Sequence, residues 1–341
     1  MHILITGGAG FIGSNLVKFH LNQGHKVHVI DDLSTGRKEN IQPFLHEPNF
    51  HFDEGDVLTW DGLERAVSGA DVIYHLAAVV GVFKVLKEPI EVLAINIAGC
   101  ERLLRAARNS HWRPRIIVAS SSEVYGNRPI VDGEHLPLHE ELELLITPGI
   151  NTRWNYSISK LANEAFAISY AKEHDMHVTA VRFFNVCGPG QRGRYGMVVP
   201  RFVSQAVNNE TITVFGDGDQ TRSFMDVRDA VKALFALANA SESAGEIVNV
   251  GSDSEITILD LANLVRKLAN SESPIEHLSY DEVYGEGFDE IAYRRPALHK
   301  LQKITGFKSR YALVDTINHL IELSKAAKEI DGDVSLVCSR A

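Results

Sequence analysis

The stretch HILITGGAGFIG, residues 2–13, decides the fold of this chain. A short apolar run leads directly into glycines at positions 7, 10 and 13, and a helix-like stretch follows near residues 14–23. Glycines at this spacing allow a tight turn, close approach of the backbone to a pyrophosphate, and close packing of helix on strand. The N-terminus of the helix then faces the negative charge. The segment therefore predicts a dinucleotide-binding loop formed by Gly7, Gly10, Phe11, Ile12 and Gly13.

The next apolar run ends in two acidic residues, Asp31 and Asp32. A carboxylate about 20 residues beyond the glycine loop can accept hydrogen bonds from the adenosine ribose hydroxyls, and it repels a 2′-phosphate. This favours NAD over NADP, although Arg37 and Lys38 lie close enough in the sequence to leave NADP open.

Runs rich in Val and Ile alternate with helix-like stretches through the first half of the chain. The runs occupy residues 2–6, 26–31, 71–77, 115–120 and 177–184, and helices are expected near 14–23, 61–68, 89–107 and 154–174. Continuous apolar strands separated by helices indicate a parallel sheet that is buried on both faces. The chain is therefore predicted to be an α/β protein, with a Rossmann-type doubly wound parallel sheet in residues 1–184.

The alternation loosens beyond residue 184, where glycine and proline interrupt the chain at 187–190. Short strand-like segments follow, and helices are expected near 227–238, 258–268 and 313–328. We expect residues 185–330 to form mainly a smaller α/β lobe that binds the substrate and is interwoven with the first domain. Residues 331–341 are expected to be a flexible tail.

The composition limits the class of protein. The chain has 341 residues, 45% of them hydrophobic, which is enough apolar material for one large domain or two smaller ones. The net charge of −10 argues against a nucleic acid partner, because a phosphate backbone is usually met by clustered Lys and Arg. The apolar start of the chain ends at Gly7, too early for a signal peptide or a membrane span. We expect no membrane partner.

The cysteines indicate neither a metal site nor a disulfide framework. Cys100, Cys187 and Cys338 lie far apart, without the paired spacing of a zinc site, and their number is odd. We therefore expect no metal, and a reducing cytoplasm as the location.

Tyr156 and Lys160 form a candidate catalytic pair. They are four residues apart in a predicted helix, so their side chains share one face. A nearby ammonium group lowers the pKa of a phenol, which can then take a proton from an alcohol while a hydride leaves for a nicotinamide. An isolated pair of this kind is more often a core tyrosine and a solvated lysine. Here the pair follows an apolar strand and the loop 120–123, whose hydroxyl groups are expected at the edge of the sheet where ligands bind.

Together these segments resemble the extended short-chain dehydrogenase/reductase family of nucleotide-sugar epimerases, dehydratases and decarboxylases. The resemblance runs from residue 1 to about 325, in the order of the family's motifs. Its segments are TGGAGFIG (6–13), HLAA (75–78), SSSEVYG (120–126), YSISK (156–160), RFFNVCGPGQ (182–191), GDGDQTRSFMDVRDAV (216–231), NVGS (249–252) and YRRP (293–296).

The resemblance implies a reaction that begins with oxidation of a nucleotide-activated sugar at carbon 4. Tyr156 would be the base, Lys160 its partner and a ribose contact, and Ser121 the hydroxyl that orients the 4-OH group. NAD would be tightly bound and recycled, because the hydride returns later. The resemblance also implies a homodimer, formed through the helices near 89–107 and 154–174.

Glu123 separates the members of the family. A 4-epimerase needs no further acid or base, whereas a carboxylate beside the reacting carbon is useful when a proton or carboxyl group moves at carbon 5. UDP-glucuronate decarboxylases and sugar 4,6-dehydratases are similar to this chain in carrying such a glutamate. The Arg153-Trp154 pair, the segment around Arg222 and Ser122 favour a UDP-glucuronate decarboxylase that forms UDP-xylose or a UDP-4-keto-pentose.

Other interpretations stay open at this point. They are a nucleotide-sugar 4,6-dehydratase, a UDP-sugar 4-epimerase, and an NAD(H)-binding sensor or scaffold without catalysis. Glu123 could instead form a salt bridge to a structural arginine, as charged residues at sheet edges often do.

The resemblance assigns the remaining contacts. The arginine at Arg222 would serve the decarboxylated intermediate or hold the diphosphate of a nucleoside-diphosphate sugar, for which a UDP-sugar is favoured. Many relatives have Pro-Asp after the last arginine, whereas Ala297 follows Pro296 here. Further substrate contacts are expected from Ser122, Asn185 and Arg294, and further cofactor contacts from Asp56, Val57, Leu76, Ala77, Ala78 and Asn96.

Overall fold

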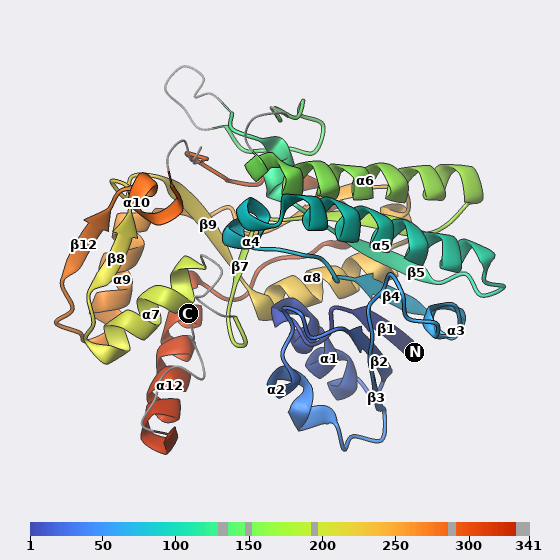
Figure 1. Cartoon of the computed structure of the whole chain (residues 1–341), viewed down its shortest axis with the longest axis horizontal. Helices are drawn as coiled ribbons and strands as arrows, with labels where there is room; N and C mark the ends of the chain where they lie inside the picture. Colours follow the sequence, from blue (N-terminus) through green and yellow to red (C-terminus); the bar gives the residue numbers. More distant parts are fainter. Residues whose placement is uncertain (129–135, 147–151, 192–196, 286–290, 332–341) are drawn as a thin grey trace.

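The computed structural model of the chain describes residues 1–128, 136–146, 152–191, 197–285 and 291–331. Figure 1 shows a large body built around a sheet and a smaller lobe beside it. The expected tail lies almost entirely outside the described residues, since Asp331 is the last residue of a helix and residues 332–341 are not described.

The body is organised around a seven-stranded sheet with the order β10-β6-β5-β4-β1-β2-β3, in which every pair of neighbours is parallel. The predicted Rossmann-type sheet is thus confirmed. The strand order reverses between β1 and β4, which is where such sheets bind ligands. The strands are β1 (His2–Thr6), β2 (Lys26–Asp31), β3 (Phe50–Glu54), β4 (Val72–His75), β5 (Arg115–Ser121), β6 (Val178–Phe183) and β10 (Ile247–Val250).

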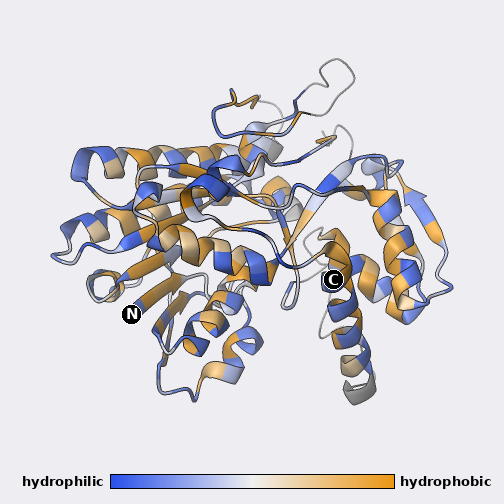
Figure 2. Ribbon diagram, turned by 180° about the vertical axis from the view of Figure 1, so that it is seen from behind, coloured by the Kyte–Doolittle hydropathy of each residue, from blue (hydrophilic) through white to orange (hydrophobic). Residues whose placement is uncertain are grey.

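Helices cover both faces of this sheet. Neighbouring residues of β1 point in opposite directions, so Ile3 packs with Leu16 of α1 in one core and Leu4 packs with Leu103 of α5 in another. In Figure 2 the helices carry both hydrophilic and hydrophobic residues, as expected when one side of each is buried. The helices of the body are α1 (Phe11–Asn22), α2 (Lys38–Ile41), α3 (Leu63–Ser68), α4 (Val82–Lys87), α5 (Pro89–Asn109), α6 (Asn155–His174), α8 (Val227–Asn239) and α11 (His299–Thr305).

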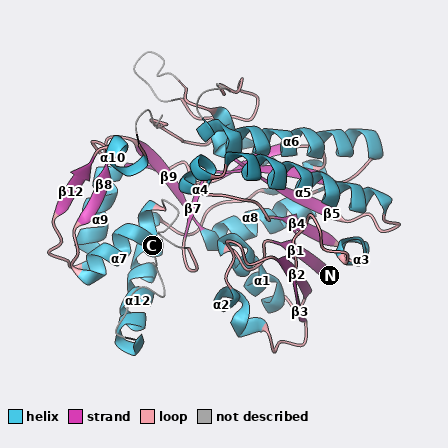
Figure 3. Cartoon of the chain, viewed as in Figure 1, coloured by secondary structure: helices cyan, strands magenta, loops and turns pink. Residues whose placement is uncertain are grey.

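The smaller lobe has two short sheets, with orders β11-β9-β7 and β12-β8, and its own core around Phe202 and Leu261. Figure 3 shows its strands to one side of the main sheet. Its elements are β7 (Asn185–Cys187), α7 (Val198–Asn208), β8 (Ile212–Phe215), β9 (Thr221–Asp226), β11 (Glu255–Thr257), α9 (Ile258–Ala269), β12 (Ile275–Leu278), α10 (Tyr280–Tyr284) and α12 (Leu313–Asp331).

The chain beyond residue 184 contributes to both parts. β10 completes one edge of the main sheet, while α8 and α11 pack on the body through Leu234 and Leu301. No helix within the described ranges is both long and apolar enough to cross a bilayer.

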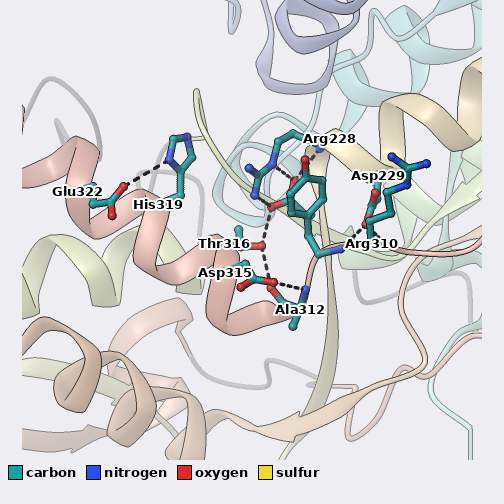
Figure 4. A network of polar contacts seen from close by, with 10 residues as sticks. Arg228, Asp229, Arg310, Ala312, Asp315, Thr316, His319 and Glu322 are labelled. Atoms are coloured by element: carbon teal, nitrogen blue, oxygen red, sulfur yellow. Dashed lines mark hydrogen bonds and ion pairs between the residues drawn. The ribbon is translucent and has the colours of Figure 1, made fainter.

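A polar network joins the two parts where β9 passes into α8 (Figure 4). Asp226 Oδ2 accepts hydrogen bonds from the Thr316 hydroxyl and from Arg228 Nη2, each at 2.7 Å. Asp229 Oδ2 accepts from the backbone N–H groups at positions 310 and 311, at 2.7 and 2.9 Å. The start of α12 is thereby fixed to the start of α8.

Candidate active site

One cavity of about 560 Å³ extends from the glycine loop past the carboxyl ends of the central strands and into the smaller lobe. It brings together all but one of the residues proposed from the sequence. These are Gly7, Gly10, Phe11, Ile12, Gly13, Asp31, Asp32, Asp56, Val57, Leu76, Ala77, Ala78, Ser121, Ser122, Glu123, Tyr156, Lys160, Asn185, Arg222 and Arg294. The exception is Asn96.

The glycine loop has the shape that a pyrophosphate requires. Gly7 has φ +74°, and a Cβ there would lie 2.7 Å from the backbone nitrogen of Ala77. A Cβ at Gly13 would lie 2.2 Å from the carbonyl oxygen of Gly7. α1 begins at Phe11 without an acidic residue in its first turn. The residues present thus fit a dinucleotide whose phosphates lie at the N-terminus of this helix.

At the end of β2, the aspartate expected to bind the ribose hydroxyls also forms hydrogen bonds within the protein. The Asp31 carboxylate is buried and accepts hydrogen bonds from the backbone N–H groups of Ala9 and Leu33, each at 2.9 Å. Burial raises the pKa of Asp31. Each carboxylate oxygen keeps a lone pair, so Asp31 can hold the loop and still accept a ribose hydroxyl. Arg37 is paired with Glu39 at 3.1 Å, so this cation is already engaged.

Asp56 caps a turn while also lining the cavity. Its Oδ1 accepts from the backbone N–H of Leu58 at 2.8 Å.

Asn96, expected to contact the cofactor, lies behind the cavity wall instead. Its side chain is 2% exposed and forms two hydrogen bonds with the backbone of Val79, from Val79 N to Oδ1 at 2.7 Å and from Nδ2 to Val79 O at 3.1 Å. Asn96 therefore fixes the shape of the loop after β4, which lines the cavity.

The candidate catalytic pair lies where β5 ends against α6. Lys160 is buried, and its Nζ donates to the carbonyl oxygen of Ala119 at 2.9 Å and lies 5.8 Å from the centre of the Tyr156 ring. Burial lowers the pKa of Lys160 to about 8. Ser121 forms a hydrogen bond with Tyr156.

The pKa of the Tyr156 phenol is raised rather than lowered. Burial and the negative charge of Glu123 raise this pKa, and they outweigh the hydrogen bond from Ser121 and the positive charge of Arg294, which lower it. The Lys160 ammonium, which bonds to Ala119, is not among the groups that shift this pKa, so the lowering expected from the Lys160 spacing is not seen.

Glu123 forms an ion pair with Arg294, with Oε1 3.3 Å from Nη2. Their side chains are 17% and 11% exposed, and both line the cavity. This is the salt bridge that the sequence left open as an alternative for Glu123. It lies inside the cavity, beside Tyr156, so it does not remove Glu123 from the candidate site.

Two further substrate-binding candidates are anchored by the backbone of the smaller lobe. Arg222 Nη1 donates to the carbonyl oxygens of Thr221 and Ala292, at 2.7 and 3.3 Å. Asn185 Nδ2 donates to the carbonyl oxygen of Ser223 at 3.2 Å. Both side chains remain on the cavity wall.

An aromatic group lines the far end of the cavity, and two of its members, Tyr280 and Tyr284, were missed by the sequence reasoning. The guanidinium carbon of Arg201 lies 3.7 Å from the centre of the Phe215 ring, and Tyr284 meets the edge of that ring with centres 5.9 Å apart. Tyr280 also lines the cavity. The one local signal was the Ser279-x-x-Glu282 capping box, which predicts a helix that places Tyr280 and Tyr284 on one side.

Comparisons with known proteins agree with this geometry. The sequence model of the NAD dependent epimerase/dehydratase family matches residues 3–251. The chain is 36% identical over 305 residues to the UDP-N-acetyl-alpha-D-glucosaminuronate decarboxylase of Bacillus cytotoxicus, covering 89% of this chain and 91% of that protein. It is 34% identical to UDP-glucuronic acid decarboxylase 1 of Xenopus tropicalis, covering 94% and 71%.

A solved structure adds a close match in fold. The UDP-glucuronic acid 4-epimerase of Bacillus cereus, in complex with UDP-glucuronic acid and NAD, has a TM-score of 0.82 and 27% identity, covering 95% of this chain and all of that one (100%).

Proposed function

Because this chain belongs to the NAD-dependent epimerase/dehydratase family, we propose that it is an NAD-dependent decarboxylase of UDP-linked uronic acids. The single observation that carries the proposal is the pair of Glu123 and Arg294 beside Tyr156 and Ser121. An epimerase has no use for a second acid–base pair next to the reacting carbon. Identities of 34–36% to two decarboxylases support the same reaction.

The cofactor site would use the glycine loop, Asp31 and the loop that Asn96 holds. When bound there, NAD would supply an acceptor for the hydride from carbon 4 of the sugar and a positive charge that favours the phenolate form of Tyr156. Ser121 orients the 4-hydroxyl group of the sugar, and Tyr156 takes its proton. Lys160 holds this end of α6 against β5 through Ala119.

Oxidation at carbon 4 makes the carboxylate on carbon 5 a β-keto acid, which loses carbon dioxide and leaves an electron pair at carbon 5 that takes up a proton from water. The resemblance offered Arg222 as the arginine that serves the decarboxylated intermediate. We assign this role to Arg294 instead, because its guanidinium lies against Glu123, whereas Arg222 donates to backbone carbonyls of its own lobe. Arg294 binds the sugar carboxylate, and Glu123 orients Arg294. Arg222 and Asn185 are left to hold the diphosphate, for which the guanidinium fork of Arg222 is suited.

The first experiment is incubation of the purified protein with UDP-glucuronate and with its 2-acetamido counterpart, followed by mass spectrometry of the products. We expect release of carbon dioxide and a UDP-pentose, UDP-4-keto-pentose or the corresponding 2-acetamido sugar. A 4-keto-6-deoxy sugar from a nucleotide hexose would indicate a dehydratase, and interconversion at carbon 4 alone an epimerase. Either result without decarboxylation would contradict the proposal.

The variant Glu123→Gln tests the role of the ion pair. Decarboxylation should fall by about 10²-fold, the scale of loss when a group that positions the substrate is itself misplaced. Glu141→Gln is the matched control, because Glu141 is an exposed glutamate, 68% exposed, that pairs with His139 outside the cavity. An epimerase would tolerate Glu123→Gln with little loss of rate.

We also propose a homodimer formed through α5 and α6, which lie side by side on one face of the body (Figure 1). Ile90, Ala94 and Ala98 of α5 are all exposed and are spaced four residues apart, so they form an apolar stripe. Sedimentation analysis should show a dimer that Ala94→Arg dissociates, while Glu47→Arg, in the loop before β3, leaves it intact. A wild-type monomer at micromolar concentration would contradict the proposal.

A cytoplasmic location is proposed on the chemistry of the thiols. Cys100 and Cys187 are free and buried, and a reducing compartment preserves such thiols. Cell fractionation tests this, and recovery of the protein from a membrane or secreted fraction would contradict it.

A further inference from the structure

Two histidines and an aspartate meet at the outer edge of the main sheet, away from the active-site cavity. His28 of β2 lies directly opposite His51 of β3, the edge strand. Asp53 follows His51 by two residues, so both side chains lie on the same face of the strand. His28 Nε2 is 2.8 Å and His51 Nε2 is 3.2 Å from the same oxygen, Asp53 Oδ2.

These distances match those of a first-row transition-metal site. In a tetrahedral zinc site the bonds to histidine nitrogen and carboxylate oxygen are about 2.0–2.2 Å, which places neighbouring ligand atoms roughly 3.3 Å apart. The potential ligand atoms of His28, His51 and Asp53 all lie within 4.8 Å of one another. An ion between them would need only small side-chain movements and would leave a fourth position for water.

We propose that His28, His51 and Asp53 form a binding site for Zn²⁺. Two imidazoles and one carboxylate are the ligands that zinc uses when one position stays open. Magnesium and calcium prefer sites made of oxygen ligands, so this set selects against them.

The surroundings allow an ion to enter and hold one of the ligands against a neighbouring ring. The His51 side chain is 66% exposed, whereas His28 is 25% exposed and lies with its ring centre 6.1 Å from Trp60. Arg65 of α3 lines a surface cavity together with the three proposed ligands. Its positive charge opposes a bound cation, so removing it should strengthen binding.

An ion at this site would link β2 to the edge strand β3. β3 runs directly into the turn at Asp56, which lines the active-site cavity. Zinc would therefore stabilise the outer wall of the cofactor site without contacting the substrate.

The test uses the full-length, tag-free protein after treatment with a chelator. Equilibrium dialysis against Zn²⁺ with metal analysis should show one ion per chain at neutral pH, and none with Mg²⁺. His51→Gln and Asp53→Asn should weaken binding by at least about tenfold, since losing a ligand costs no less than losing an outer partner. Arg65→Met should tighten it.

His139→Gln is the matched control, because His139 is an exposed histidine that pairs with a single carboxylate, Glu141. It should bind zinc as the wild type does. Circular dichroism and NAD binding establish that each variant is folded. Failure of the wild type to retain zinc, or unchanged affinity in folded His51→Gln, would overturn the proposal.

Discussion

Lys160, a proposed catalytic residue, carries a cost in stability. Its folded pKa is about 8, against an ordinary value of 10.5, because burial disfavours the charged form. Below pH 8 both the folded and the unfolded chain carry the proton, so the full cost of burying the charge is present. Between pH 8 and 10.5 the unfolded chain binds more protons, and stability therefore rises with pH.

Replacing Lys160 by Met should thus stabilise the ligand-free protein by about 1–2 kcal/mol at pH 7, after allowing for the lost hydrogen bond to Ala119. The same variant should lose nearly all catalytic activity. Urea denaturation at pH 7 and pH 10 measures the effect, and the gain should shrink at the higher pH. A variant less stable than the wild type at pH 7 would contradict this account of the lysine.

Single residues also show what local sequence can predict. The glycine loop and the Tyr156 and Lys160 pair follow from spacing within one turn or one helix. Glu123 and Arg294 are 171 positions apart, so no local pattern indicates their contact. The His28, His51 and Asp53 cluster depends on the register of two strands. The expectation of no metal rested on the cysteine spacing, which carries no information about that register.

At the scale of elements, a buried ion pair holds together the strand and helix that carry the proposed catalytic residues. Ser120 of β5 lies opposite Arg182 of β6, and Glu164 of α6 bonds both. Glu164 Oε1 accepts from the Ser120 hydroxyl at 2.5 Å, and the two Glu164 oxygens accept from Arg182 at 2.8 Å each. Glu164 and Arg182 are 1% and 3% exposed, so neither charge has water as an alternative partner.

Glu164→Gln should destabilise the protein by about 3–5 kcal/mol, because it leaves the Arg182 charge buried without a counter-charge. The double variant Glu164→Gln/Arg182→Met should recover part of this loss. Chemical denaturation of the wild type, both single variants and the double variant gives the coupling energy. Additive effects of the two substitutions would show that the pair is not a unit.

The elements of the first half were predictable because apolar runs and helical periodicity alternate without interruption. The predicted helix near 89–107 is α5 (Pro89–Asn109), and the one near 227–238 is α8 (Val227–Asn239). The short α10 was not predicted, since its five residues bury none of their side chains. Its place is set by contacts with Phe215 and Gly216 across the lobe.

At the scale of the whole molecule, Asp226 holds the smaller lobe to the body. Burial would raise the pKa of Asp226, but the hydrogen bonds from Arg228 and Thr316 outweigh it, and the pKa lies below its ordinary value of 3.8. The stabilisation is therefore fully present above pH 3.8 and is lost as the pH falls through the lower folded value.

Asp226→Asn should cost about 2 kcal/mol of unfolding free energy at pH 7, the usual loss for hydrogen bonds to a charged group. The difference between wild type and variant should stay constant from pH 7 to pH 5 and shrink below about pH 4. Denaturation series at these pH values measure it. Asp217→Asn, in an exposed turn, is the control. A difference that grows on acidification would contradict the linkage.

The place of β10 in the main sheet also sets an order of events during synthesis. β6 is paired on one side by β5 and on the other only by β10, which spans Ile247–Val250. A nascent chain that has emerged only as far as Phe184 therefore presents β6 as a bare edge, the kind of surface that recruits another chain. Translation must deliver some sixty further residues before that edge is closed, so the ribosome-bound intermediate is the stage most exposed to misassembly and to capture by chaperones.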